Sequence, residues 1–207
     1  MESPYLEILN QKPEHPVLEE IRSLASALKI PIIQKDGLQL IRQFLLASGA
    51  RKVLELGSAI GYFAIFTALY ANVDVTSVEV DPQLLAAAAK FAKKAGVGNK
   101  IDFMNADALS LDAGIFRDYD LLFIDAAKSQ YQKYFTMYSG SVRTGGIIVS
   151  DNLLFRGHVE HPETIISRNR RQLVNKIRQY NTWLKEQPGF LTYFYEIGDG
   201  IAISIKE

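Results

Sequence analysis

Three side chains whose oxygen atoms could bind a metal ion follow apolar segments in "FIDAAK" and "GGIIVSDN". They are Asp125, Asp151 and Asn152. Both segments are predicted to be buried strands of a parallel sheet, whose carboxyl ends meet at one edge. A carboxylate buried without a partner is costly, so we expect something to satisfy these groups. Two carboxylates and an amide oxygen suit Mg²⁺ or a similar divalent cation. The structural alternatives are a helix cap at Asp125 and an Asx turn at Asp151 and Asn152.

A glycine-containing loop, "VLELGSAIGYFA", joins an apolar strand to a helix. Its pattern is E-x-G-x-x-x-G over Glu55, Gly57 and Gly61, which is neither G-x-G-x-x-G nor a phosphate-binding P-loop. The glycines allow a tight turn and close approach to a ligand, and the helix that follows offers free N–H groups. The alternative is a tight strand–helix turn with no ligand.

Two acidic residues end the next strands along the chain. Glu79 lies in "VTSVEVD", about 20 residues beyond the glycine loop, where an acid suits the two hydroxyls of a ribose. Asp107, in "NADAL", is placed to face an adenine amino group. The loop and the acids together predict a cofactor that contains adenosine, and on the loop alone NAD is one such candidate.

The elements that must position these residues alternate along the chain. Residues 1–50 have helical periodicity and form an N-terminal helical cap, with the connector "PIIQKDG" between two helices. Residues 51–207 alternate strands with helices and end in a hairpin around "GDG", which predicts a Rossmann-like α/β core. Strands are predicted at 52–57, 74–80, 100–107, 119–126, 145–152, 190–197 and 201–207, and helices at 14–30, 36–50, 62–71, 81–96, 129–142 and 164–187. We therefore expect a single domain, 1–207, with a mostly parallel seven-stranded sheet and one antiparallel hairpin strand.

Composition excludes several classes of function. There is no cysteine in the 207 residues, which excludes disulfides, thiolate metal sites and cysteine nucleophiles. No apolar run approaches the roughly 18 residues of a membrane span, and the start of the chain does not resemble a signal peptide. We expect a soluble, cytoplasmic protein that does not engage a membrane.

The glycine loop, the acid after the second strand and the hairpin together resemble the class I S-adenosyl-L-methionine-dependent methyltransferases over roughly residues 50–207. The resemblance implies that Gly57 and Ser58 lie near the methionine part of the cofactor. It further implies that Glu79 holds the ribose and that Ala106 and Asp107 lie at the adenine. The full set of candidate cofactor-binding residues is Ile32, Glu55, Gly57, Ser58, Gly61, Tyr62, Glu79, Ala106, Asp107 and Asp125.

The motifs "FIDAAKSQYQKYF" and "SDNLLFRG" are similar to those of the metal-dependent O-methyltransferases of the catechol and caffeoyl-CoA type. The resemblance implies that Asp125, Asp151 and Asn152 bind Mg²⁺ or a related ion. It also implies that Lys128 is the candidate general base, with Asp125 beside it at the catalytic centre. The alternative for Lys128 is a solvated residue at a helix start.

A basic segment suggests the substrate. Residues 156–186 contain seven basic and three acidic residues, a net charge of +4 in a chain whose charges sum to zero. Arginines bind phosphates well, although a solvated helix face is the alternative. The RNA-contact candidates are Lys35, Arg156, Arg168, Arg170 and Arg171.

Longer motifs, "PIIQKDG", "RRQLVNKIRQYNTWL" and "IGDGIAISIK", resemble the bacterial tRNA 5-hydroxyuridine methyltransferases. The resemblance implies a tRNA anticodon loop as partner and 5-methoxyuridine at the wobble position as product. It also places Ile32 at the cofactor and Lys35 near the entrance. The alternatives are a small-molecule catechol-type O-methyltransferase, an NAD dehydrogenase and a non-catalytic nucleotide-binding module. We also expect a homodimer, formed through the N-terminal helices and the aromatic hairpin.

Overall fold

A single sheet organises the computed structural model, which describes residues 4–10 and 13–207. Its order is β3-β2-β1-β4-β5-β7-β6, and β7 runs antiparallel to both neighbours while the other pairs are parallel. The strands are β1 (Lys52–Leu56), β2 (Asp74–Glu79), β3 (Ile101–Asn105), β4 (Tyr119–Ile124), β5 (Val142–Ser150), β6 (Phe190–Tyr195) and β7 (Ile201–Lys206). The predicted sheet, with its antiparallel hairpin strand, is confirmed.

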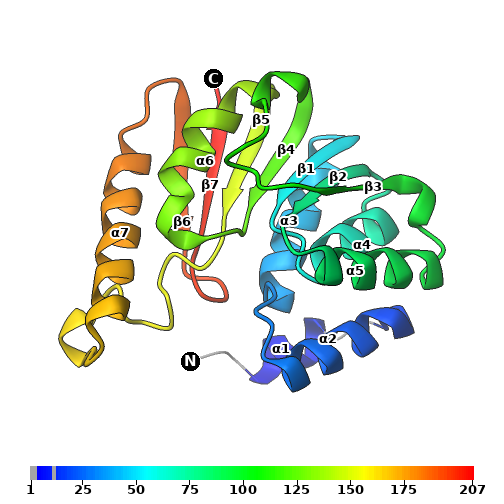
Figure 1. The fold of residues 1–207 in the computed structure, drawn as a ribbon, viewed down its shortest axis with the longest axis horizontal. Coiled ribbons are helices and arrows are strands. Elements are labelled where there is room, and N and C mark those ends of the chain that lie inside the picture. The colour runs from blue at the N-terminus through cyan, green and yellow to red at the C-terminus, as the bar shows by residue number, and fades with distance from the viewer. Residues whose placement is uncertain (1–3, 11–12) are drawn as a thin grey trace.

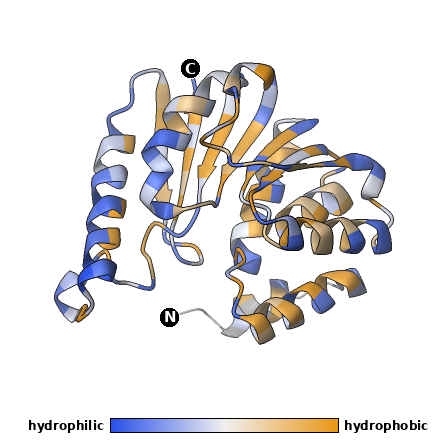
Figure 2. Cartoon of the chain, viewed as in Figure 1, coloured by the Kyte–Doolittle hydropathy of each residue, from blue (hydrophilic) through white to orange (hydrophobic). Residues whose placement is uncertain are grey.

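Helices cover both faces of this sheet (Figure 1). They are α1 (Pro4–Asn10), α2 (Pro16–Leu28), α3 (Lys35–Ala47), α4 (Tyr62–Tyr70), α5 (Pro82–Lys94), α6 (Tyr131–Tyr138) and α7 (Arg168–Lys185). One core cluster joins α2, α3, α4 and α5 to the sheet, and a second joins α6 and α7 to the opposite face. Much of the central sheet is hydrophobic, whereas α7 is largely hydrophilic (Figure 2).

Local sequence explains where helix α5 begins and ends. Asp81 Oδ1 accepts a hydrogen bond of 2.8 Å from the Gln83 amide, and Pro82 occupies the first turn. The helix ends at Lys94, and Gly96 follows with φ +75°, a conformation that glycine adopts without a steric penalty. The helix predicted at residues 81–96 is confirmed, within two residues at each end.

Three predicted features of the helices are wrong. Helix α7 begins at Arg168 rather than at residue 164, because residues 162–164 form a separate 3₁₀ turn. Helical spacing in the sequence predicts Leu173 on the apolar face of α7, but Val174 is buried there instead. The same spacing predicts Leu28 on the apolar face of α2, but it is 61% exposed because it is the last residue of the helix and the chain turns away there.

The order of the strands reverses between β1 and β4, so the loops after β1, β4 and β5 gather at one edge of the sheet. Open α/β sheets bind ligands at this reversal, outside the carboxyl ends of the strands. Those loops carry the glycine motif, Asp125 and Asp151. In the described part of the chain, no helix has the length and apolar character needed to span a membrane.

Candidate active site

A narrow cleft lies between the glycine loop and the connector before α3. Six of the ten predicted cofactor-binding residues line it, namely Ile32, Glu55, Gly57, Ser58, Tyr62 and Asp125. These residues come from the connector, from the end of β1, from the first turn of α4 and from the end of β4. The fold thus brings together side chains that are far apart in the sequence.

Gly57 is required where β1 and β4 approach each other at this cleft. Its φ is +95°, and a Cβ atom there would lie 2.5 Å from the carbonyl oxygen of Asp125. Gly61 has a different role. It precedes α4 with φ +81°, and a Cβ would lie 2.9 Å from Ala88 Cβ, so it permits α4 and α5 to pack closely and is not among the residues that line the cleft.

Ser58 carries an unsatisfied polar atom into the cleft. The residue is 4% exposed, and its buried Oγ has no hydrogen-bond partner in the described residues. A buried hydroxyl without a partner costs about 1–3 kcal/mol, so the atom is suited to bind a polar ligand group. The residues here therefore fit the methionine end of S-adenosylmethionine, which has a carboxylate and an amine.

Glu79 fastens the glycine loop to the end of β2. Its Oε2 accepts a 2.9 Å hydrogen bond from the Ala59 backbone amide. Its Oε1 accepts one of 2.9 Å from the Asp81 backbone amide. Ala106 donates its amide to the Glu79 carbonyl, so Ala106 and Asp107 lie beside it at the next strand end. Asp107 is exposed, and its carboxylate accepts from the Leu109 amide at 2.9 Å. These three predicted residues flank the cleft and do not line it.

Two carboxylates meet at the tips of β4 and β5. The register pairs Ile124 with Ser150, so Asp125 and Asp151 occupy equivalent positions one residue further on. Asp151 is 3% exposed, and burial raises the pKa of both carboxyl groups; the charge of Asp125 raises that of Asp151 further. Lys128 Nζ lies 3.6 Å from Asp125 Oδ1 and opposes the rise at Asp125.

Asn152 completes the group of oxygen donors. Its backbone amide and its Nδ2 donate to Asp151 Oδ1 and Oδ2 at 2.7 and 2.9 Å, which leaves its side-chain oxygen available to another partner. The Asx turn, the structural alternative, requires the amide two residues further on, but the amides of Leu153 and Leu154 donate to the carbonyls of residues 200 and 199 instead. Across residues 4–10 and 13–207 there is no cluster of three or more His, Cys, Asp or Glu suited to a metal, so an ion here requires the Asn152 oxygen. Two carboxylates and one amide oxygen fit Mg²⁺.

Sequence reasoning missed the residues that hold these tips in place. Tyr131 donates its hydroxyl to the Asp151 carbonyl at 3.1 Å, and Ser150 Oγ lies 2.7 Å from the Tyr180 hydroxyl. Asn181 donates to the Leu153 carbonyl at 3.1 Å. The tyrosines and Asn181 come from α6 and α7, and nothing in their local sequence distinguishes them from ordinary packing residues.

The predicted RNA-contact residues do not lie in the cleft. Lys35 is exposed and its Nζ is 3.7 Å from Glu14 Oε2, on the side of the N-terminal helices. Arg156 is exposed in the loop after β5. The other three candidates, Arg168, Arg170 and Arg171, are exposed on the first turn of α7.

Comparisons with known proteins identify the family of this chain. Residues 8–207 match the family model described as O-methyltransferase. The chain belongs to the O-methyltransferase family. It is thus an enzyme of the general class that the strand-tip and glycine-loop motifs predicted.

Individual relatives of this O-methyltransferase extend the comparison. Tricin synthase 1 of Oryza sativa subsp. japonica is 35% identical, over 81% of this chain and 71% of the relative. A Staphylococcus aureus protein, provisionally named a caffeoyl-CoA O-methyltransferase, is 34% identical with a TM-score of 0.92 over 98% of both chains. The O-methyltransferase TomG of Streptomyces achromogenes, solved in complex with S-adenosylmethionine, shares the fold at 21% identity, with a TM-score of 0.81 over 98% of this chain and 94% of that one.

Proposed function

We propose that this O-methyltransferase methylates a hydroxyl that has a second oxygen beside it, using S-adenosylmethionine and a divalent cation. The observation that carries the proposal is the position of Asp125, Asp151 and Asn152 at neighbouring strand tips, next to the cleft of the glycine loop. Two adjacent substrate oxygens can chelate one cation that the protein holds through three donors.

The chain contributes position, charge and exclusion of water. When bound, the cation supplies Lewis acidity that favours ionisation of the acceptor hydroxyl, and S-adenosylmethionine supplies the methyl group. Lys128, 3.6 Å from Asp125 and with a side chain only 15% exposed, is positioned to receive the proton of that hydroxyl. Tyr131 and Tyr180 fix the tip of β5, and a fixed geometry lowers the entropic cost of bringing the reacting atoms together.

For the acceptor we propose 5-hydroxyuridine at the wobble position of tRNA, converted to 5-methoxyuridine. Its hydroxyl lies beside a carbonyl oxygen, which reproduces the two adjacent oxygens of a catechol. An anticodon base is unpaired and can be placed in a pocket, with basic side chains on the flanking phosphates. The exposed arginines at the start of α7 support this acceptor, since arginine side chains bind phosphate groups well.

The second candidate is a small catechol-like phenol. It is supported by the relatives at about a third identity, whose names include tricin synthase and flavonoid 3′,5′-methyltransferase. The same three oxygen donors would serve both acceptors, so the surface that surrounds them decides between the two.

Replacement of Arg170 and Arg171 by alanine separates the two acceptors. For a tRNA enzyme we expect weaker methylation of an anticodon stem-loop and unchanged methylation of free catechol. Replacement of the exposed Lys90 and Lys93 on α5 is the matched control for loss of charge. Unchanged activity on both substrates would contradict the binding of RNA to α7.

Mass spectrometry of tRNA nucleosides from a deletion strain tests the product directly, since 5-methoxyuridine should be replaced by 5-hydroxyuridine.

The cofactor and the metal are tested separately. Asp151→Ala should abolish methyl transfer and retain binding of S-adenosylhomocysteine in calorimetry, because Asp151 is not among the residues that line the cofactor cleft. Full activity in EDTA would refute the requirement for a divalent cation. Tight binding of NAD with no binding of S-adenosylhomocysteine would overturn the whole proposal in favour of a nucleotide-binding or dehydrogenase function.

We further propose a homodimer. Large apolar side chains are exposed on α1 (Tyr5, Leu6, Ile8 and Leu9, 54–69%) and on β6, where Leu191 and Tyr193 are 61% and 67% exposed. Strand β6 is also the last strand of the sheet, and an edge strand can pair with another chain. Light scattering with Leu191→Glu/Tyr193→Glu should show a monomer where the wild type is a dimer, and a monomeric wild type would refute the proposal.

A further inference from the structure

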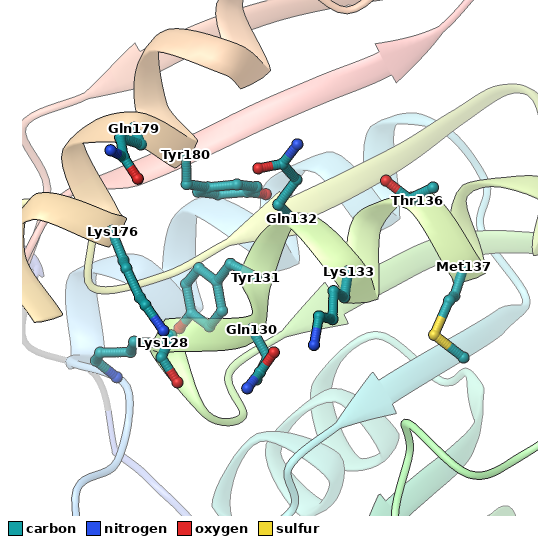
Figure 3. A pocket seen from close by; sticks show the side chains of 11 residues that line it. Lys128, Gln130, Tyr131, Gln132, Lys133, Thr136, Met137, Lys176, Gln179 and Tyr180 are labelled. Atoms are coloured by element: carbon teal, nitrogen blue, oxygen red, sulfur yellow. The ribbon is translucent and has the colours of Figure 1, made fainter.

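A second and larger cavity, of about 500 Å³, lies between α6 and α7 and not in the cofactor cleft. We name it the α6–α7 pocket; it is lined by residues 128–133, Thr136, Met137, Lys176, Gln179 and Tyr180. A cavity of this size lies within the usual range for small-molecule sites. Figure 3 shows Lys176 extending from α7 toward the segment that bears Lys128 and Gln130.

The pocket adjoins the proposed metal-binding tips, which are Asp125, Asp151 and Asn152 at the ends of β4 and β5. Two residues make the connection. Lys128 lines the pocket, and its Nζ is 3.6 Å from Asp125 Oδ1. Tyr131 also lines the pocket, and its hydroxyl donates to the Asp151 carbonyl at 3.1 Å. A group bound in the pocket would therefore be next to whatever occupies the metal-binding tips.

The walls of the pocket carry positive charge without nearby compensation. Residues 128–138 and 168–185 contain no aspartate or glutamate, so neither wall supplies an acid. Lys133 and Lys176 form no ion pair with any residue that the structure describes, and only Lys128 has an acidic partner. The amino groups of Lys133 on α6 and Lys176 on α7 therefore remain available to an anion in the cavity, which both would attract.

The remaining lining groups favour phosphate and sugar over a stacked base. Ser129, Thr136 and three glutamine side chains add hydroxyl and amide donors, which are common partners of phosphate and ribose oxygens. The rings of Tyr131 and Tyr180 are only 1% and 2% exposed, so they form the floor and present no open aromatic face for stacking. The positive charge continues along α7 to Arg168, about 12 Å from Lys176 at 1.5 Å per residue.

We propose that the α6–α7 pocket binds the phosphate and ribose of the nucleotide that neighbours the methylated base. The inference rests on the proposed tRNA function, and it assigns one subsite of that substrate. Lys133 and Lys176 contact the phosphate, and Lys128 lies between this subsite and the reacting hydroxyl.

The test compares Lys133→Gln/Lys176→Gln with the control Lys90→Gln/Lys93→Gln on α5, which removes the same charge from a distant exposed surface. With an anticodon stem-loop that carries 5-hydroxyuridine, we expect kcat/KM to fall about tenfold or more in the pocket variant, through KM. The slope of log affinity against log salt should become shallower by roughly 1.4 for two lost phosphate contacts to single-stranded RNA. Methylation of free catechol should stay unchanged, which shows that the fold and catalytic groups are intact.

Two results would refute the proposal that the α6–α7 pocket binds phosphate and ribose. Both can be distinguished from failure of the proposed tRNA function. Equal stem-loop kinetics and salt slopes in the wild type and pocket variant refute the pocket while the tRNA function stands. If the wild type methylates catechol and does not bind the stem-loop, the tRNA function fails. Calorimetry with uridine 3′,5′-bisphosphate then decides the pocket: binding to the wild type and control that is lost in the pocket variant supports a phosphate site, and equal or absent binding refutes it.

Discussion

Glu55 shows how burial, more than any other cause, sets the charge of an acidic side chain that lines the cleft. The residue is 1% exposed on β1, and the Ser77 hydroxyl donates to it. Burial raises the pKa of Glu55 to about 8, and the nearby charges of Asp125 and Glu79 add to the rise. The side chain is therefore mostly uncharged at neutral pH, and it can act as a hydrogen-bond donor as well as an acceptor.

Replacing Glu55 with glutamine should flatten the dependence of stability on pH. The pKa of Glu55 in the folded state, about 8, is above the ordinary value of 4.5, so its stabilising contribution is complete below pH 4.5 and is lost as pH rises through 8. At roughly 1.4 kcal/mol per pKa unit, the loss amounts to a few kcal/mol at most. Urea unfolding at pH 5 and pH 9 measures it, with the exposed Asp102→Asn as control. Parallel pH profiles for wild type and Glu55→Gln would contradict this prediction.

Gly57 offers a second prediction at the scale of one residue. Gly57→Ala should destabilise the protein and remove binding of S-adenosylhomocysteine, because the new Cβ would lie 2.5 Å from a backbone oxygen. Gly49→Ala is the matched control, since Gly49 has φ +64° with nothing within 4 Å of an added Cβ. The control should cost only the left-handed strain, about 1–2 kcal/mol, and should keep ligand binding. Similar losses in the two variants, by urea unfolding and calorimetry, would argue against a close approach at Gly57.

At the scale of elements, the loop after β5 is held by the turn between β6 and β7. Asn152, Phe155 and Arg156 all have positive φ, which is uncommon outside glycine and costs conformational energy. Hydrogen bonds to the turn between β6 and β7 offset this conformational cost. Leu153 and Leu154 donate their amides to the carbonyls of residues 200 and 199 at 2.9 and 2.8 Å, and Arg156 donates its amide to the Asp199 carboxylate. The antiparallel hairpin thus stabilises the loop that begins with two metal-binding candidates.

Asp199→Ala should therefore weaken the site from a distance. We expect a loss of about 1–3 kcal/mol in stability, from the hydrogen bond to the Arg156 amide, and a higher Mg²⁺ concentration for half-maximal methylation. Asp199→Asn retains an acceptor oxygen and should retain most of both properties. Magnesium titrations and hydrogen exchange of the Arg156 amide measure the effect, and equal behaviour of the alanine and asparagine variants would show that this hydrogen bond is unimportant.

Local patterns explain which elements could be predicted. The strand tips with Asp125 and Asp151, and the ends of α5, follow from periodicity and capping residues, which act within a few positions of the chain. The start of α7 was misplaced because residues 162–164 form a separate 3₁₀ turn, and Ile165 and Ser167 are extended before the helix begins at Arg168. The α6–α7 pocket could not be predicted, since it depends on how two helices far apart in the sequence pack on one face of the sheet.

At the scale of the whole molecule, charge is balanced in sum and uneven in space. The 23 basic and 23 acidic residues cancel, yet α7 has no acid and Asp125 and Asp151, the two carboxylates proposed to bind a metal, lie together at the edge of the sheet. Such a pair opposes folding when both groups are ionised, because burial and their mutual repulsion both disfavour the charged forms. A cation that binds the folded state and not the unfolded chain would reverse this effect.

Addition of MgCl₂ should therefore raise the Tm, and the increase should grow with pH. The raised pKa values of Asp125 and Asp151 mean that protons compete with the cation at low pH, so its binding and its stabilisation strengthen as both groups lose their protons. At a concentration of 100 Kd, the stabilisation is about 2.7 kcal/mol. Scanning calorimetry at pH 6 and pH 8, with MgCl₂ or EDTA, measures it. Asp151→Asn should abolish the shift, and the exposed Asp107→Asn should keep it; a shift of the same size in Asp151→Asn would place the cation elsewhere in the protein.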